Sequence, residues 1–407
     1  TETKEAVEKV TLNIKSTVNM APYQTDNKGG YAFKNLPLAQ DYTITPKRDD
    51  DPMNGVSTID LVLIQKHILG SQSLSSPYKM IAADVDRNND ITALDLVELR
   101  KLILTIYDKL PNNSSWRFVP KSYDFSKVSN VLSADIPEYL NISQLSKEEL
   151  EKDFIGVKIG DVNSSSAAHS LLGAEARESA GTLKFKIEDK VLKAGEETTV
   201  SFTSDNFSKV EGYQFSMQVT GLSIVDIKSS ALKVDASNFG LGKLNQGYLT
   251  TSWSDGTNPA TVSNGETLFT IKVKATKNTV LSEAIRINSR FTRAEAYVNN
   301  TNGTSLLNVG LEFSNSKSTP SVYALYQNTP NPFKGQTIIS FDLPKSETVT
   351  LSISDVTGKM IRSYSIDGNK GANRMTLNRA ELSAAGVLYY TLETKSFRDT
   401  KKMLLVD

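Results

Sequence analysis

The chain has 407 residues, with 46 basic and 46 acidic side chains and no cysteine. Single hydrophobic cores rarely grow beyond about 250–300 residues, so this length predicts several domains. The balanced charge argues against a nucleic-acid partner, and the lack of cysteine excludes disulfides, thiolate metal sites and a cysteine nucleophile. No apolar run approaches the ~18 residues of a transmembrane helix. The polar opening at Thr1 leads us to expect a processed or truncated C-terminal part of a longer protein.

Residues 1–46 contain three short alternating stretches, "VTLNI", "GGYAFKNL" and "YTITP". Asn, Gly and Pro turn signals separate them, which is typical of β-strands joined by turns. The stretches resemble the closing strands of the prealbumin-like or carboxypeptidase-regulatory-like β-sandwich repeats of bacterial surface proteins. The resemblance implies a partial β-sandwich without its opening strand, and a generic three-stranded meander is the alternative.

Residues 84–95, "DVDRNNDITALD", have the ligand spacing of a twelve-residue calcium loop. Such loops supply oxygens from positions 1, 3, 5, 7, 9 and 12. Here those positions are Asp84, Asp86, Asn88, the carbonyl of Asp90, Thr92 and Asp95. Position 6 requires a positive φ, which Asn89 adopts more readily than most residues. A solvated acidic turn that caps a helix is the alternative, but such a turn needs only one or two of these side chains.

The segment "GVSTIDLVLIQKHILG" (55–70) aligns without gaps to "DITALDLVELRKLILT" (90–105), an offset of 35 residues that indicates an internal duplication. In the first copy positions 1, 3, 9 and 12 are Asp49, Asp51, Ser57 and Asp60, while Met53 occupies position 5. We therefore predict a second, weaker calcium site there. A loop that keeps its fold without the ion is the alternative.

The two loop–helix units, residues 47–108, resemble the dockerin type I module. The resemblance implies Ca²⁺ as cofactor and a cohesin partner that binds around loop positions 10 and 11. Those positions hold Thr58 and Ile59 in the first repeat, and Ala93 and Leu94 in the second. Pairing within the chain and pairing between chains both remain open.

Beyond the second repeat, "LSKEELEKDF" (145–154) predicts a helix, because a serine stands three residues before a glutamate. The stretch "DFIGVKIGDVN" resembles the tail that closes dockerin-type regions of Bacteroidetes-like surface proteins. Asp161 and Asn163 in this tail are either a ligand pair or part of a plain turn, and we favour the turn. We place a dockerin-like module with a C-terminal extension at residues 47–165 and a small, polar linker at 166–180.

Residues 181–314 show the period-2 alternation of short strands, as in Leu183, Phe185 and Ile187. The run "LKAGEETTVSFTSDNFSKVEGYQFSMQV" resembles the early strands of cohesin-like modules. The resemblance implies a cohesin-like β-sandwich, and a different jelly-roll or Ig-like sandwich is the alternative. Such a sandwich would also be compatible with carbohydrate binding.

A second linker, residues 315–322, leads into the final segment, 323–407. Alternation in "TIISFDL" and "VTLSISD" predicts a small antiparallel sandwich. The segment contains four motifs in this order along the chain: Asn-Pro-Phe, "DVTGK", "GVLYY" and the terminal "TKKMLLVD". This order resembles the C-terminal sorting domain of the type IX secretion system. The resemblance implies partners in the type IX translocon and the outer-membrane sorting machinery.

The sequence offers little for catalysis. Its two histidines, His67 and His169, have no nearby "GxSxG"-like partner, and no phosphate loop or zinc signature is present. Trp116 and Trp253, with Tyr248, would form either a sugar-stacking platform or part of the core, and we favour the core. We expect a non-catalytic chain.

Together these patterns predict a mainly β, multidomain protein, with β-sandwiches in series and one small α-helical, calcium-binding dockerin-like module. We expect the non-catalytic C-terminal region of a secreted, cell-surface adhesin or surface-assembly component. Its location would be extracellular or on the outer face of a Gram-negative outer membrane. The alternative is the accessory tail of a large secreted polysaccharide hydrolase or peptidase whose catalytic domain precedes residue 1.

Overall fold

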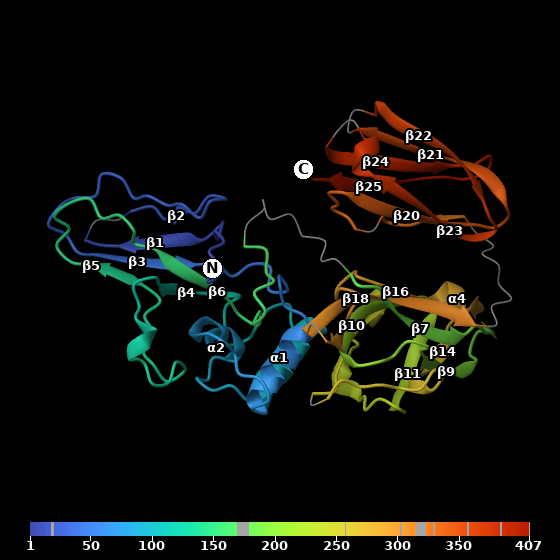
Figure 1. Ribbon diagram of the computed structural model, residues 1–407, viewed down its shortest axis with the longest axis horizontal. Helices are drawn as coiled ribbons and strands as arrows, with labels where there is room; N and C mark the ends of the chain where they lie inside the picture. Colours follow the sequence, from blue (N-terminus) through green and yellow to red (C-terminus); the bar gives the residue numbers. More distant parts are fainter. Residues whose placement is uncertain are drawn as a thin grey trace. The chain divides into compact units, whose positions relative to one another are not determined.

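The computed structural model describes residues 1–17, 20–168, 179–256, 258–301, 303–314, 323–328, 330–355, 358–382 and 385–406. The described residues up to 314 belong to one compact unit, and those from 323 onward belong to a second. Several β-sheets and a small helical region between residues 58 and 103 make up the fold (Figure 1). The predicted fold class, mainly β with one small helical module, is confirmed. The linker 315–322 and most of the linker 166–180, including His169, lie outside the described residues.

The N-terminal sheet is antiparallel and has the order β2-β1-β3-β5. Its strands are β1 (Thr11–Lys15), β2 (Tyr23–Gln24), β3 (Tyr42–Lys47) and β5 (Leu140–Ile142). Alternate side chains bury one face of this sheet, namely Leu12, Ile14, Tyr42, Ile44 and Ile142. Because β5 comes from beyond the helical region, the segments 1–46 and 47–165 are interleaved in the fold.

Three helices follow, α1 (Thr58–Ile68), α2 (Pro77–Ala83) and α3 (Ala93–Ile103). Both α1 and α3 begin with a capping box, Ser57 with Asp60 and Thr92 with Asp95, so the duplication is also a structural one. Their shared core includes Leu61, Ile64, Leu99 and Leu102, together with residues of the two-stranded antiparallel sheet formed by β4 (Trp116–Pro120) and β6 (Phe154–Lys158). A short 3₁₀ turn, η1 (Phe125–Lys127), lies between these two strands in the chain.

The helix predicted within residues 145–154 is wrong. Residues 145–153 form no helix, and β6 begins at Phe154. Leu145 instead exchanges backbone hydrogen bonds with Ala39 and Gln40, and its side chain joins the core of the N-terminal sheet. Tertiary pairing therefore overrides the local capping signal.

Residues 182–314 fold into a β-sandwich with the strand order β11-β14-β9-β7-β18-β17-β10-β13-β12, and β16 lies beside β10. A separate short ribbon pairs β8 with β15. The strands are β7 (Thr182–Glu188), β8 (Val191–Leu192), β9 (Glu197–Thr203), β10 (Val210–Val219), β11 (Leu222–Ser229), β12 (Phe239–Gly240), β13 (Tyr248–Ser254), β14 (Thr267–Ala275), β15 (Thr279–Val280), β16 (Ile285–Asn288), β17 (Glu295–Asn300) and β18 (Gly303–Ser314). Short helical turns η2 (Ala236–Asn238), η3 (Leu244–Gln246) and α4 (Leu281–Ala284) connect them.

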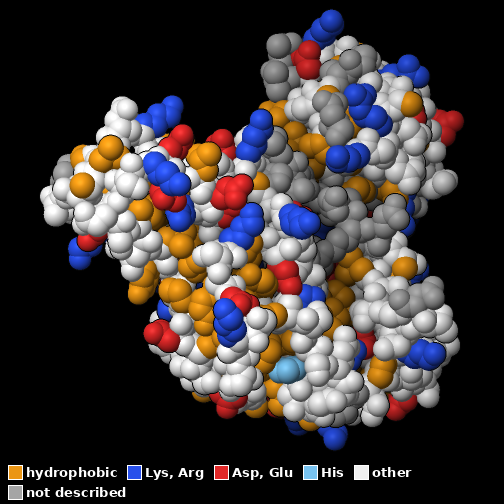
Figure 2. Space-filling view, turned by 60° about the vertical axis from the view of Figure 1, so that its left-hand side comes forward, with side chains coloured by type: hydrophobic (Ala, Val, Ile, Leu, Met, Phe, Trp, Pro, Cys, Tyr) orange, Lys and Arg blue, Asp and Glu red, His pale blue; other side chains and the backbone are white. Residues whose placement is uncertain are grey.

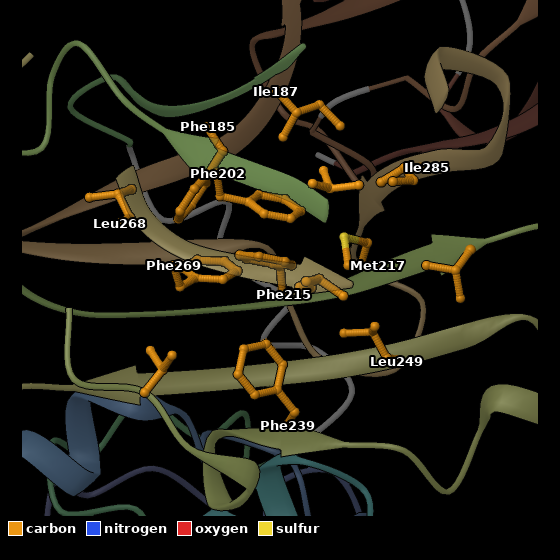
Figure 3. Packing of buried hydrophobic residues seen from close by; sticks show 14 of the residues in the cluster. Phe185, Ile187, Phe202, Phe215, Met217, Phe239, Leu249, Leu268, Phe269 and Ile285 are labelled. Atoms are coloured by element: carbon orange, nitrogen blue, oxygen red, sulfur yellow. The ribbon is translucent and has the colours of Figure 1, made fainter. Parts of the chain in front are cut away.

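Aromatic rings fill the core of this sandwich (Figure 3). Phe202 and Phe269 stack with ring centroids 4.7 Å apart, and Phe185 meets Phe215 edge-on at 5.4 Å. Trp253 is also buried here and donates its indole N–H to the carbonyl of Lys233. Trp116 is buried in another core, so both tryptophans pack inside the protein, and neither forms an exposed stacking platform.

The second unit is a small antiparallel sandwich of two sheets, β19-β20-β23 and β22-β21-β24-β25. Its strands are β19 (Ala324–Leu325), β20 (Gln336–Leu343), β21 (Glu347–Asp355), β22 (Met360–Gly368), β23 (Gly371–Asn378), β24 (Gly386–Glu393) and β25 (Arg398–Leu405), with one 3₁₀ turn, η4 (Arg379–Glu381). Buried side chains from both sheets form a single core.

Among the described residues, no helix has the length and apolar character needed to cross a membrane. On the face shown in Figure 2, basic and acidic side chains are interspersed rather than gathered into one strongly basic patch.

Candidate functional site

The loop 84–95 brings three carboxylates together. Ligand oxygens of Asp84, Asp86 and Asp95 lie within 4.8 Å of one another, and the first and last of these side chains are buried. Backbone amides hold the carboxylates in place: Asn88 N–H donates to Asp84 (3.0 Å) and Val85 N–H donates to Asp95 (2.7 Å). The loop therefore presents an all-oxygen donor set, which suits a hard divalent cation.

The rest of the loop also follows the predicted pattern. Asn89 at position 6 has φ +67°, the left-handed conformation required there. Thr92, at position 9, accepts a hydrogen bond from the amide of Leu94 and caps α3, which projects Asp95 back toward the loop. The side-chain amide of Asn88 donates a hydrogen bond to Asp86. The side chain of Asp90 accepts a hydrogen bond from the amide of Ile91, and the backbone carbonyl of Asp90 is the expected metal ligand at position 7.

The electrostatics of the loop favour a bound cation. Burial raises the pKa of Asp84 and of Asp95 despite their backbone hydrogen bonds. Asp86 adds a further negative charge beside both groups. A cation between the carboxylates would relieve this repulsion and the cost of desolvation.

The residues predicted for the first loop are not gathered in the same way. Asp49 accepts hydrogen bonds from the amide and hydroxyl of Ser115, at 2.8 and 3.1 Å. Met53 packs against the helical core. Ser57 and Asp60 do lie together, but among the described residues Asp49, Asp51 and Asp60 do not form a metal-type cluster.

The start of α1 is buried against the 182–314 sandwich. Thr58 is fully buried; its amide and its hydroxyl both reach Oε1 of Gln214 on β10, at 2.7 and 2.9 Å, and the hydroxyl also contacts Ser252 on β13 at 2.7 Å. Ile59 and Val62 pack against the ring of Tyr297 on β17. A buried polar network whose members are hydrogen-bonded favours one specific arrangement of the surfaces that it joins.

One turn further along α1, Lys66 forms an ion pair of 2.5 Å with Glu211, whose side chain is only 2% exposed. Asn299 and Thr304 also donate to Glu211. Burial alone would raise the pKa of Glu211, but the hydrogen bonds from Lys66 and these two neighbours outweigh it and lower the pKa.

The end of α3 contacts the same sandwich surface. The hydroxyls of Thr250 and Thr292 donate to the carbonyls of Leu104 and Ile103, each at 2.6 Å. These bonds satisfy carbonyls that have no partner within a helix at its C-terminus. We call the combined contact of α1 and α3 with β10, β13 and β17 the docking surface.

In the second unit, the Asn-Pro-Phe motif holds the last strand. Asn331 accepts from the amide of Leu404, and Phe333, buried in the core, exchanges two backbone hydrogen bonds of 3.0 Å with Leu404 and Val406. Tyr390 from the "GVLYY" motif is also buried and accepts from the amide of Asn328. The sequence motifs therefore meet in one folded domain.

Comparisons with known families agree with this geometry. Residues 54–104 match the dockerin type I domain. Residues 328–406 match the secretion system C-terminal sorting domain. The sorting domain indicates secretion across the outer membrane of a Bacteroidetes-type cell, to the surface or the medium. The dockerin indicates protein–protein assembly with a cohesin partner.

Solved structures similar to the chain include cohesins. One is the seventh ScaB type I cohesin of Pseudobacteroides cellulosolvens, with 17% identity over 33% of this chain and 88% of the cohesin, at a TM-score of 0.25. Another is the third ScaC cohesin of Acetivibrio cellulolyticus in complex with a ScaB dockerin, with 18% identity over 31% of this chain and 98% of the cohesin, at a TM-score of 0.21. Similarity this low does not define a partner. No curated protein matches the chain.

Sequence reasoning identified the dockerin side of the docking surface, because Thr58 and Ile59 are the first-repeat positions 10 and 11. It missed the sandwich side. Gln214, Thr250 and Ser252 alternate with buried apolar residues on β10 and β13, and such positions read as a solvent face. The sequence signal for a contact at Gln214, Thr250 and Ser252 was their lack of charge, since a solvent-exposed strand face usually carries more lysine and glutamate.

The residues near the start of α3 that correspond to the buried residues of α1 are exposed to solvent. Leu94 and Val97 are 50% and 43% exposed, whereas their first-repeat equivalents, Ile59 and Val62, are buried. Ile68 and Leu69 at the end of α1 are exposed too, while Ile103 and Leu104 at the end of α3 are buried. The sandwich therefore covers one of two related faces of the dockerin.

Proposed function

We propose that this chain is a non-catalytic region of a secreted surface protein in which the dockerin pairs with the β-sandwich of the same chain. The pair would form a rigid spacer that presents neighbouring domains at the cell surface. In this proposal the sandwich acts as the cohesin-like partner of the dockerin. An adhesive or surface-assembly role follows, because such a spacer contributes reach and stiffness rather than chemistry.

The observation that carries this proposal is the buried hydrogen-bond network of Thr58 with Gln214 and Ser252. Uncompensated burial of these polar groups would cost about 1–3 kcal/mol each, so their mutual satisfaction favours a specific contact. The connection through one chain also raises the effective concentration of the two partners.

We further propose that Asp84, Asp86, Asn88, the Asp90 carbonyl, Thr92 and Asp95 hold Ca²⁺. The ion would neutralise the buried carboxylates and fix the start of α3. Because α3 carries Ile103 and Leu104 to the docking surface, calcium would support the pairing as well as the dockerin fold.

The absence of a catalytic role is supported by what the polar groups do. His67, the one histidine among the described residues, accepts the amide of Leu74 on Nδ1 at 3.3 Å. The buried acids named above serve as helix caps, as members of the cation loop or as ion-pair partners. No nucleophile is placed beside a base among them.

The docking surface is tested in the full chain with the double variant Thr58→Arg and Ile59→Asp. Its matched control is Ala93→Arg with Leu94→Asp, at the equivalent, exposed positions of the second repeat. Hydrogen exchange of α1 and β10 should accelerate in the first variant and stay at the wild-type rate in the control, and small-angle scattering should report a larger radius of gyration only for the first. Equal behaviour of the two variants would contradict internal pairing.

A further inference from the structure

The segment 161–166 repeats the geometry of residues 84–89. In the calcium loop, the amides of Asn88 and Asn89 donate to the two carboxylate oxygens of Asp84. In the same way, the amides of Ser165 and Ser166 donate to the two oxygens of Asp161, at 2.9 and 2.8 Å. The backbone conformation of the fourth residue in each segment also agrees, since Arg87 has φ +61° and Ser164 has φ +59°. Residues 161–165 therefore have the backbone arrangement of positions 1 to 5 of loop 84–95.

The second half of that loop comes from residues 55–60. Asp95 accepts from the amides of Val85 and Asp86 on one oxygen and from Thr92 on the other. Asp60 likewise accepts from Val162 and Asn163, at 3.0 and 3.3 Å, on one oxygen and from Ser57, at 2.9 Å, on the other. The position-12 carboxylate thus binds its loop through equivalent amides in both repeats, although in the first repeat the amides lie 102 and 103 residues away along the chain.

The two segments meet where the intact loop has a peptide bond. A Cβ atom on Gly55 would lie 2.6 Å from the amide nitrogen of Ser166, so only glycine permits this approach. The hydroxyl of Ser165 donates to the carbonyl of Gly55 at 2.9 Å. Next to the junction, the amide group of Asn54 makes two hydrogen bonds with the backbone of Ala167. The break is therefore held closed by specific contacts.

One atom at this position points to a ligand. The Oδ1 oxygen of Asn163, which corresponds to position 3, is buried and accepts no hydrogen bond within the described part of the chain. Buried polar atoms in native structures are almost always satisfied, so an oxygen at a ligand position without a protein partner points to a ligand from outside the chain. Asp60 brings a second carboxylate to this place, because it accepts hydrogen bonds from the amides of Val162 and Asn163, which directly follow Asp161.

We propose that residues 55–60 and 161–165 form a second calcium site, assembled from two distant chain segments. Its ligands are Asp161, Asn163, Ser165, the carbonyl of Gly55, Ser57 and Asp60, in the order of positions 1, 3, 5, 7, 9 and 12. This site takes the place of the one expected from Asp49 and Asp51. The inference rests on the calcium role proposed for loop 84–95, whose geometry it repeats.

The split site is weaker than the intact loop. It has two carboxylates where the intact loop has three, and affinity for calcium rises with ligand charge. The ammonium of Lys158 is buried nearby, donates to the carbonyl of Pro52 at 2.8 Å and interacts electrostatically with Asp161 and Asp60. A fixed positive charge next to the site opposes cation binding.

Calorimetric titration of the chelator-treated full chain with calcium tests this inference. The wild type should bind two ions, the tighter one at loop 84–95. Asn163→Ala removes an oxygen that has no protein partner, so it should leave the melting temperature in chelator unchanged. The same variant should weaken the second ion by about tenfold or more, because even supporting residues of metal sites contribute that much. Asp86→Ala, at the same position of the intact loop, is the matched control and should weaken the first ion instead.

The outcomes separate the two assignments. One ion in the wild type, with Asn163→Ala binding like the wild type, would overturn the split site and leave the role of loop 84–95 intact. Two ions that are both insensitive to Asp86→Ala would overturn the role of loop 84–95. A lower melting temperature of Asn163→Ala in chelator would assign the side chain to the fold rather than to a cation.

Discussion

The two repeats of the dockerin have nearly the same sequence pattern but opposite surroundings. The second repeat has a continuous cation loop, and Leu94 and Val97 near the start of α3 face solvent, while only the end of α3 contacts the sandwich. The first repeat depends on the rest of the unit, since its loop is completed by residues 161–166 and its helix is covered by the sandwich. Duplication supplied two copies of one surface, and the tertiary contacts gave each copy a different role.

The largest expected difference between the repeats concerns calcium. Asp95→Ala should abolish cation binding at the continuous loop and so remove about 2.7 kcal/mol of stabilisation at a hundredfold excess of calcium over the dissociation constant. Thermal denaturation of the full chain with calcium and with chelator measures this. If the variant responds to calcium as the wild type does, loop 84–95 is not the principal site.

The next effect concerns the lysines that occupy equivalent positions in α1 and α3. Lys66→Met would leave Glu211 buried without its charged partner and should reduce the free energy of unfolding by about 2 kcal/mol. Lys101→Met removes solvent-exposed contacts with Glu98 and Tyr107 and should have a much smaller effect. Urea denaturation of both variants gives the comparison, and equal losses would show that the two lysines have equivalent environments.

A smaller effect is expected on the sandwich side of the docking surface. At Gly240 a Cβ atom would lie 2.2 Å from the carbonyl oxygen of Leu104, so Gly240→Ala should destabilise the contact by about 1–2 kcal/mol through overpacking. Gly242, with no atom within 4 Å of a built Cβ, is the control position for the same substitution. Hydrogen exchange at the end of α3 should increase only in Gly240→Ala.

The smallest effect is on pH dependence. Because the folded-state pKa of Glu211 is lowered, its ion pair contributes fully above the unfolded pKa of about 4.3 and is lost as the pH falls through the folded value. In chelator, the wild type should therefore lose part of its stability below about pH 4, and Glu211→Gln should show less of this loss. Matching pH profiles of the two proteins would contradict the lowered pKa of Glu211.

Much of the molecule was predictable from local patterns. The loop 84–95 and the alternating strands are encoded within about twelve residues each, and the first-repeat positions Thr58 and Ile59 followed from the dockerin resemblance. The placement of β5 beside β3 was not predictable, because its three residues carry no pairing signal. Neither was the split loop, since "DVNSS" completes "GVSTID" across about a hundred intervening residues. A comparison of "GDVN" (160–163) with "ADVD" (83–86) was the one available signal.

The junction of Gly55 with Ser166 has a consequence for how the chain folds. A cation held by both segments would act as a reversible cross-link that closes a loop of about a hundred residues, and closing a loop of that length carries a large entropic cost. The continuous loop closes only twelve residues and can form early, as soon as they leave the ribosome or translocon. The split loop forms only after the intervening helices and strands have packed. Occupancy of the continuous loop 84–95 therefore reports local order, whereas occupancy of the split site reports that the whole unit has reached its native topology.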